Sequence, residues 1–178
     1  MSDDSLQGID VSLLSKEQLM AIVDALASLI RTRATEQESL EIIVNLACQL
    51  TYSAGAAVEK VVDDHLVYVG VTDNTKHNDG LHIPLEGSLS GRCLNEKRLL
   101  RCDDAQTDDR VDKEACEKVG LRSMMVAPVT FDGGDAGVLK VFSMKACAYD
   151  DVDEQILRVF TTIVSHTLAE GWPADAPQ

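Results

Sequence analysis

The first fifty residues carry apolar side chains at three- and four-residue spacing, which predicts two helices. The first helix begins at the capping-box residues Ser15 and Gln18 and is expected to end near Arg33. The second begins at a similar pair, Thr35 and Glu38. Two adjacent apolar stripes follow the first helix: Leu19, Ile22, Leu26 and Leu29 form one, and Met20, Val23, Ala27 and Ile30 form the other. A double stripe suits a helix that packs on two sides, and it predicts a homodimer built from the first and last helices.

From about residue 55 the apolar period changes to two, which is typical of β-strands. "GAAVEKVV" and "HLVYVGV" predict a hairpin, and "LHIPLE" predicts a third strand that Pro84 places at an edge or a strand end. "LLRCD" predicts a fourth strand, and residues 119–143 supply a fifth and a sixth, joined at "DGGD". Short helices are expected at "GSLSGRCLNEK" and at "VDKEACEKVG", and a long helix ends near Gly171.

This order of elements predicts an α+β fold, built as one domain over residues 15–171 after a flexible lead-in at 1–14. The long helices at the two ends of the sequence are expected to pack on one face of an antiparallel sheet. Short central helices and loops then cover the other face. The tail at 172–178 contains Pro173 and Pro177 and is not expected to continue the last helix, so the chain stands alone or forms the first piece of a longer sensor.

The charge balance argues against nucleic acid and membrane partners. The 178 residues include 16 basic and 30 acidic ones, a net charge of −14, which repels anionic polymers and surfaces unless a basic patch overrides it. The densest basic run, "EKRLLR", is followed directly by "CDDAQTDD". No apolar run reaches membrane-spanning length and the first residues are acidic, so a cytoplasmic protein is expected. The five scattered cysteines are expected to be reduced thiols, with no metal or cofactor site.

Candidate binding chemistry begins with Ser123 and Lys140, which lie in otherwise apolar strands. Alternation puts Lys140 on the same face as Val138 and Phe142. A buried ammonium group is costly unless it meets a carboxylate, an anionic ligand or water. Lys140 is therefore expected either to recognise a carboxylate or phosphate of a ligand, or to reach solvent or pair with an aspartate at 103–104.

The neighbouring strand residues follow the same alternation. Met124 and Val126 are expected to line the same cavity as Lys140, because a strand displays every second side chain on one face. Arg122 is expected on the opposite side. Arg110 is expected to tie its own loop through a nearby aspartate, since carboxylates outnumber it there.

The segment "GSLSG" at 87–91 is a second candidate element. If a helix starts there, its backbone N–H groups and the hydroxyls of Ser88 and Ser90 form a cup for an anion or a carbonyl group. Ordinary helix capping is the alternative interpretation. Cys93 lies in the first turns of the same helix, where a thiolate is favoured, although a small buried hydrophobe is the usual role of a free cysteine.

Three stretches carry a family resemblance: Leu-Arg-Ser followed by Val-Ala-Pro within 121–128, Gly-Val-Leu at 137–139, and "DAQTDDR" at 104–110. Their order and spacing resemble those of a GAF domain, a small-molecule-sensing module of signalling proteins, over about residues 36–170. The resemblance implies a six-stranded antiparallel sheet with the N- and C-terminal helices on one face. It also implies a ligand pocket between the other face, which would carry Lys140, and the short covering helices.

The resulting hypothesis is a non-enzymatic sensor in which a bound small molecule signals through the terminal helices. A cytoplasmic homodimer is expected, as the bacterial input module of a diguanylate cyclase, a histidine kinase or a regulator. The predicted ligand-binding residues are Ser88, Ser90, Cys93, Cys116, Ser123, Met124, Val126, Lys140 and Phe142.

Three alternatives stay open. Free methionine sulfoxide reductases are GAF enzymes that resemble this chain in length and use thiols at three positions. Those positions hold Gly80, Ser90 and, about one residue out of register, Cys116, and the family's pocket carboxylates are replaced by Met124, Lys140 and Phe142. A thiol-based redox sensor would use Cys93, Cys102 and Cys116. A structural dimerisation module would fill the pocket with its own side chains.

Overall fold

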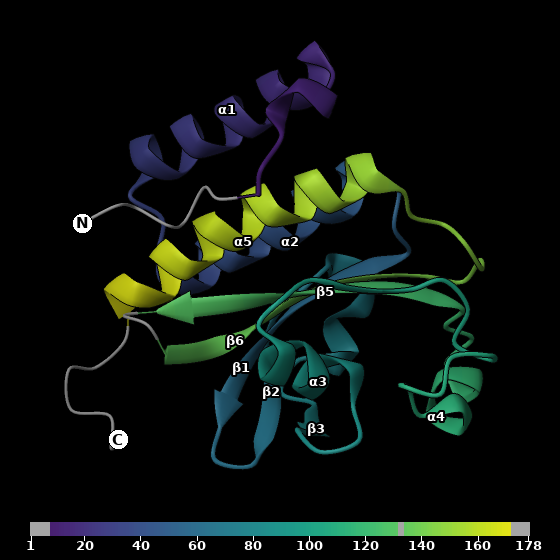
Figure 1. The fold of residues 1–178 in the computed structure, drawn as a ribbon. Helices are drawn as coiled ribbons and strands as arrows, with labels where there is room; N and C mark the ends of the chain where they lie inside the picture. Colours follow the sequence, from purple (N-terminus) through teal and green to yellow (C-terminus); the bar gives the residue numbers. More distant parts are fainter. Residues whose placement is uncertain (1–7, 132–133, 172–178) are drawn as a thin grey trace.

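The computed structural model describes residues 8–131 and 134–171 (Figure 1). Six strands form one antiparallel sheet in the order β3-β2-β1-β6-β5-β4. Their bounds are β1 Gly55–Val62, β2 His65–Val71, β3 His82–Pro84, β4 Leu100–Cys102, β5 Ser123–Phe131 and β6 Gly134–Ser143. The predicted α+β fold is confirmed, and β3 with its Pro84 lies at an edge, where a missing N–H group disturbs no ladder. The predicted turn at "DGGD" includes residues 132–133, which lie outside the described residues, as does the tail.

Long helices cover one face of the sheet (Figure 1). α2 (Glu36–Leu50) and α5 (Asp151–Gly171) contact each other and the strands, and α1 (Lys16–Thr32) lies outside them, away from the sheet. The buried apolar cluster on this face includes Val58, Met125, Leu139 and Val141 from the strands and Phe160 from α5. The main core of the domain is therefore the layer between these helices and the sheet.

Both predicted capping boxes are present. Ser15 Oγ accepts a hydrogen bond from the Gln18 N–H group at 3.1 Å, and Thr35 Oγ1 accepts one from Glu38 at 3.3 Å. α1 ends at Thr32, and Arg33 follows it as the C-cap with a positive φ of 49°. A left-handed residue at this position reverses the chain within the short connection to α2.

Short elements cover the opposite face. α3 (Leu89–Glu96) contacts β5 and β6, while α4 (Lys113–Lys118) lies at the end of the sheet (Figure 1). A second apolar cluster fills this side and includes Leu89, Cys93, Leu94, Leu100, Met124, Val126 and Val138. The predicted division of long and short helices between the two faces is confirmed.

Two short 3-10 helices, η2 (Val11–Leu13) and η3 (Asp73–Asn78), were not predicted. Next to η2, the Leu14 side chain is buried in the main core. The Asp10 N–H group donates a 2.7 Å hydrogen bond to Gln155 on α5. Residues 8–14 therefore contact the domain, where the sequence had predicted a flexible lead-in. No helix within the described ranges is long and apolar enough to cross a membrane.

Candidate functional site

Three polar side chains meet on the sheet face that α3 covers: Glu59 from β1, Tyr68 from β2 and Lys140 from β6. Glu59 pairs with Tyr68 across the β1–β2 ladder, and Lys140 pairs with Ala57 across the β1–β6 ladder. Since Ala57 and Glu59 are two residues apart, alternation puts Glu59 and Lys140 on the same face as diagonal neighbours. We call these three residues the polar triad.

The triad is buried and closely spaced. Lys140 Nζ lies 3.4 Å from Glu59 Oε1 and donates a hydrogen bond to the Tyr68 hydroxyl at 3.2 Å. The Glu59 side chain is 0% exposed, and the Lys140 side chain is 11% exposed. Glu59 is therefore fully enclosed, while Lys140 keeps a small contact with solvent. The sequence prediction that Lys140 pairs with an aspartate at 103–104 is wrong, because its carboxylate partner is Glu59.

The protonation states follow from these contacts. Burial alone would lower the pKa of Lys140, but the charge of Glu59 and the contact with Tyr68 outweigh it, so the pKa of Lys140 is raised above its ordinary value. Burial, the largest cause, raises the pKa of Tyr68 as well. At neutral pH the site thus holds an ammonium group beside an un-ionised phenol.

Glu59 is the unusual member of the triad. Neither of its buried carboxylate oxygens has a hydrogen-bond partner among the described residues. The 3.4 Å contact with Lys140 is an ion pair that lacks hydrogen-bond geometry. A carboxylate can accept about four hydrogen bonds, and a buried polar group left without one costs about 1–3 kcal/mol. Tyr68 and Lys140 are nevertheless close enough that contact with Glu59 helps to raise the pKa of both side chains. The site therefore holds an acceptor that its own donors meet only in poor geometry.

Apolar residues flank the triad on both sides. Ala57, Tyr68 and Val71 form a small buried group with Ile83 packed against it. On the other side lie Met124, Val126 and Val138, with Phe142 packed at their edge. A side chain at Gly55 would place its Cβ 2.4 Å from the Phe142 ring, so this glycine leaves the space that the ring occupies. The arrangement is a small polar centre in an apolar surround.

The structure brings together several of the predicted site residues. Met124, Val126, Lys140 and Phe142 share one face, as the alternation predicted. Cys116 packs against the same cluster. Whether these residues contact a ligand stays a prediction.

The "GSLSG" residues have structural partners. Ser88 is the N-cap of α3, and its hydroxyl accepts a hydrogen bond from the Gly91 N–H group at 3.0 Å. Ser90 is buried in the first turn of α3. The buried Cys93 thiol donates to the carbonyl oxygens of Arg98 and Val126. The capping interpretation therefore accounts for Ser88, and Cys93 takes the role of a small buried side chain.

Ser123 is not brought together with Lys140. By alternation it lies with Met125, on the opposite face of β5 from Met124. Its hydroxyl donates a 2.7 Å hydrogen bond to the Lys145 carbonyl oxygen. The predicted pairing of Ser123 and Lys140 as polar groups of one pocket therefore fails, because adjacent strand positions face opposite sides.

The sequence reasoning missed Glu59 and Tyr68. Glu59 is the acidic residue of an otherwise apolar strand face that also carries Ala57 and Val61. An acidic residue in that register, matched by a lysine in another strand, was the available signal. Only the pairing of β1 with β6 shows that the two charges meet.

Two of the thiols, those of Cys102 and Cys116, are poorly suited to act as nucleophiles. Burial, with a contribution from Asp108, raises the pKa of Cys102 to about 12. Burial also raises the pKa of Cys116, although the charge of Lys140 acts against it. Both thiols are therefore un-ionised at neutral pH. Among the described residues, no group of three or more His, Cys, Asp or Glu side chains is placed to hold a metal ion.

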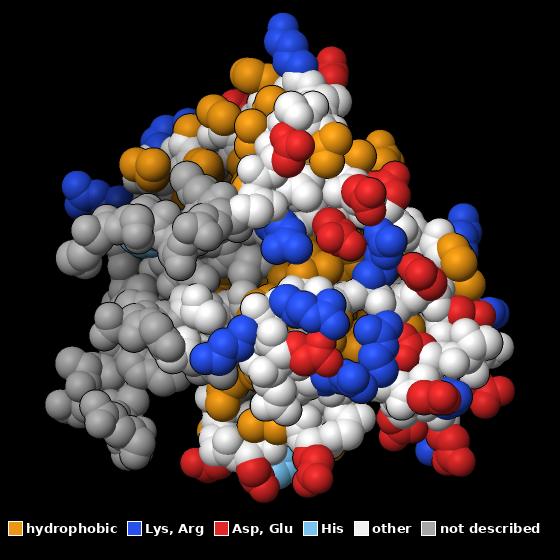
Figure 2. All heavy atoms as spheres, in the orientation of Figure 1, with side chains coloured by type: hydrophobic (Ala, Val, Ile, Leu, Met, Phe, Trp, Pro, Cys, Tyr) orange, Lys and Arg blue, Asp and Glu red, His pale blue; other side chains and the backbone are white. Residues whose placement is uncertain are grey.

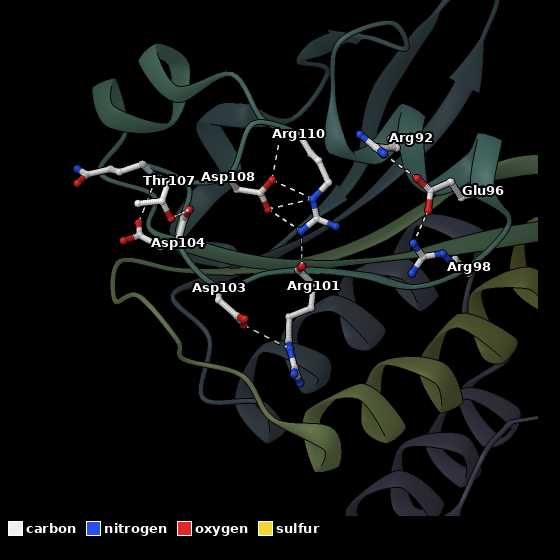
Figure 3. A network of polar contacts seen from close by, with 10 residues as sticks. Arg92, Glu96, Arg98, Arg101, Asp103, Asp104, Thr107, Asp108 and Arg110 are labelled. Atoms are coloured by element: carbon white, nitrogen blue, oxygen red, sulfur yellow. Dashed lines mark hydrogen bonds and ion pairs between the residues drawn. The ribbon is translucent and has the colours of Figure 1, made fainter.

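A network of arginines and carboxylates ties the loop between β4 and α4 (Figure 3). Arg110 donates to both Asp108 oxygens and to the Arg101 carbonyl oxygen, which confirms that Arg110 ties its own loop. Arg122 forms a two-point contact with Asp104, and does not join the triad.

The basic run at 96–101 is neutralised in the same way. Arg98 pairs with Glu96, and Arg101 pairs with Asp103. Figure 2 shows basic and acidic side chains interleaved across this surface. The predicted cancellation of its local field is confirmed at the level of these ion pairs.

A family model described as the GAF domain matches residues 33–169. The GAF domain of an Acinetobacter phosphoenolpyruvate-protein phosphotransferase is similar in structure, with a TM-score of 0.75 at 16% identity over 89% of this chain and 96% of that one. The chromophore-binding domain of a Stigmatella aurantiaca phytochrome has a TM-score of 0.69 at 14% identity, over 92% of this chain and 62% of that one.

A type II free methionine-R-sulfoxide reductase from Thermoplasma acidophilum is also similar, with a TM-score of 0.61 at 18% identity over 76% of this chain and 96% of that one. A search of curated proteins gave no match. Structural likeness at these identities shows a shared fold.

Proposed function

The chain belongs to the GAF domain family, and from this premise we propose that it is a non-enzymatic sensor domain that binds a small molecule against the polar triad. The observation that carries the proposal is the fully buried Glu59 carboxylate, which has no hydrogen-bond partner in the described structure. A buried, unused acceptor among apolar side chains lowers stability, and a ligand that satisfied it would recover this loss on binding.

Signalling requires that the ligand bind two conformations with unequal affinity. The sheet offers a mechanical connection, because β5 and β6 contact α3 on the triad side and α5 on the other. A ligand that reorders α3 would shift the packing of β5 and β6 and, through them, of α5. We propose that this makes the domain an input module of a bacterial cytoplasmic signalling protein, such as a diguanylate cyclase, a histidine kinase or a regulator.

The ligand proposal is tested by native mass spectrometry of the purified chain, followed by thermal denaturation with a panel of metabolites. Retention of a small molecule by the wild type and its loss from Glu59→Gln support the proposal. Absence of any retained molecule, together with no shift of the melting temperature by any panel member, overturns it. A Cys147→Ser variant is a matched control, since Cys147 is exposed and outside the triad.

The outer face of α1 supports the predicted homodimer. Met20, Val23 and Ile30 are exposed, Ile30 by 79%, and with Ala27 they follow the three-four spacing of a two-helix seam. A groove of about 880 Å³ lies between α1 and α2 on another side of α1, which Ala21 and Ala25 line. A second copy presents the same seam, so we propose that two α1 helices pair and bury it.

Sedimentation velocity tests this pairing. Wild type is expected to sediment as a dimer, and the Val23→Glu/Ile30→Glu double variant as a folded monomer. Asp24→Lys is the control, because it changes charge on the same helix outside the seam. A monomeric wild type, or a seam variant that stays dimeric, rejects α1 pairing.

The rival function is the reduction of free methionine sulfoxide, the activity for which the Thermoplasma neighbour is named. The raised pKa values of Cys102 and Cys116 favour the non-enzymatic alternative, since the attacking species would be a thiolate. A thiol-dependent turnover assay separates the two. Reduction of the sulfoxide that disappears in Cys116→Ser would replace the sensor proposal with the enzyme.

A further inference from the structure

Resting on the proposed sensor function, we infer the chemical class of the ligand: a molecule of zero net charge that presents an N–H group to Glu59 and, close beside it, an oxygen acceptor to Lys140. Zwitterionic amino acids and primary amides share this chemistry. This ligand class replaces the carboxylate or phosphate ligand that Lys140 alone had suggested from the sequence.

Charge is the first step. Lys140 and Glu59 carry opposite charges 3.4 Å apart, so the pair has no net charge. A simple carboxylate or phosphate that approaches Lys140 meets the Glu59 carboxylate at close range, inside a site where water screens little. A simple cation meets Lys140 in the same way. A ligand of zero net charge with its own donor and acceptor avoids both repulsions.

Hydrogen bonding is the second step. Both Glu59 oxygens are buried acceptors without a donor among the described residues. The Lys140 ammonium has three N–H donors, and one goes to the Tyr68 hydroxyl. What the site lacks is a donor in hydrogen-bond geometry to Glu59, since Lys140 and Tyr68 lie beside this carboxylate without meeting that geometry. What the site can offer in return is a second Lys140 donor.

Geometry sets the third step. Because Nζ and Oε1 are 3.4 Å apart, the donor and the acceptor of the ligand must be near neighbours in its covalent structure. The Lys140 side chain keeps 11% exposure while Glu59 has none, so a ligand reaches Lys140 first and must be compact at that end. Ile83 and Phe142, both partly buried at the edges of the apolar groups, suit an aliphatic remainder.

The experiment uses two sets of probes, and the members of each set share the same aliphatic side chain. Isothermal titration of the full purified chain compares leucine, 4-methylpentanamide, 4-methylpentanoate and 3-methylbutylamine, and repeats the comparison with alanine, propionamide, propionate and ethylamine. We expect the amino acid or the amide of a set to bind roughly tenfold or more tightly than the anion and the amine. The amino acid and amide arms distinguish the two sources of the shared chemistry.

Variants tie the binding to the triad. Glu59→Gln is expected to weaken binding of the preferred probe roughly tenfold or more, because an acceptor pair is replaced by one acceptor and one donor group. Tyr68→Phe keeps the ring and removes the hydroxyl, and is a second variant if Glu59→Gln does not fold. Cys147→Ser is expected to bind as the wild type does.

The two proposals fail differently. Tighter binding of the anion than of its amino acid and amide partners, or a retained natural ligand that carries net charge or no N–H group, overturns the ligand class and leaves the sensor function standing. No binding by any probe, together with no retained molecule, overturns both.

Discussion

The two faces of the sheet bury adjacent residues of the same strands in different ways. On β6, Leu139 faces α2 and α5 and is fully buried in an apolar core, while the next residue, Lys140, is buried on the α3 face beside Glu59. Burial is nearly equal, but among the described residues the buried side-chain oxygens without a hydrogen-bond partner both belong to Glu59, in the charge pair on the α3 face. The difference is what the proposed binding function requires of the second face, and the variants below test it.

The ion pairs repeat this contrast. Asp108 near the surface accepts several hydrogen bonds from Arg110. Glu59 in the interior meets no donor in hydrogen-bond geometry within the described part of the chain. An ion pair with complete hydrogen bonding, such as Asp108–Arg110, holds the local structure together. A buried pair without it has carboxylate oxygens that could still accept a hydrogen bond from a ligand.

The largest effect is expected from Lys140→Met. The substitution keeps an unbranched side chain but leaves the Glu59 carboxylate buried without an opposite charge, so we expect the free energy of unfolding to fall by about 3–5 kcal/mol. Urea denaturation followed by circular dichroism measures it. A loss under about 1 kcal/mol would contradict the burial of the pair.

The double variant Glu59→Gln/Lys140→Met is its control. It removes both charges, so we expect it to be more stable than Lys140→Met alone. A double variant that is less stable than Lys140→Met would show that the fall in the free energy of unfolding comes from lost packing and not from the unpaired Glu59 carboxylate.

Leu139→Ala tests the apolar face one residue away. Removing this fully buried side chain leaves a cavity in the main core, and we expect a loss of about 3 kcal/mol in the free energy of unfolding. Titration with the preferred probe, at a temperature where the variant is folded, should give wild-type affinity. A selective loss of affinity in Leu139→Ala would remove the functional distinction between the two faces.

The smallest effect is expected at the Asp108–Arg110 ion pair. Hydrogen bonds from Arg110 are the main cause that lowers the pKa of Asp108 from 3.8 to about 2. Because the folded-state pKa is the lower one, this contribution to stability is present above pH 4 and is lost as the pH falls toward 2. The Asp108 side chain is 14% exposed, and Asp108→Asn should cost about 1–2 kcal/mol at pH 7.

Unfolding of Asp108→Asn at pH 7 and pH 3 checks the sign, since its deficit should shrink at the lower pH. Asp109→Asn is the matched control, because that neighbouring carboxylate is exposed and pairs only with Lys113 in the described structure. A deficit of Asp108→Asn that grows at pH 3 would contradict the assigned direction.

Local patterns were enough to predict the elements. The capping boxes at Ser15 and Thr35, the change of period near residue 55 and the edge position of Pro84 all depend on neighbours within a few residues. Alternation also placed Met124, Val126 and Lys140 on one face. These features follow from the sequence because helix caps and strand periodicity are short-range properties of the backbone.

The tertiary structure alone decided the partners. Alternation relates a side chain to the others of its own strand, but it does not say which strand lies beside it. The pairing of β1 with β6 and with β2 brings Glu59 and Tyr68 to Lys140 from distant parts of the chain, and the same folding puts Ser123 on the far side of β5. The polar triad on which the proposed binding depends is therefore a product of long-range strand pairing, which no single segment encodes.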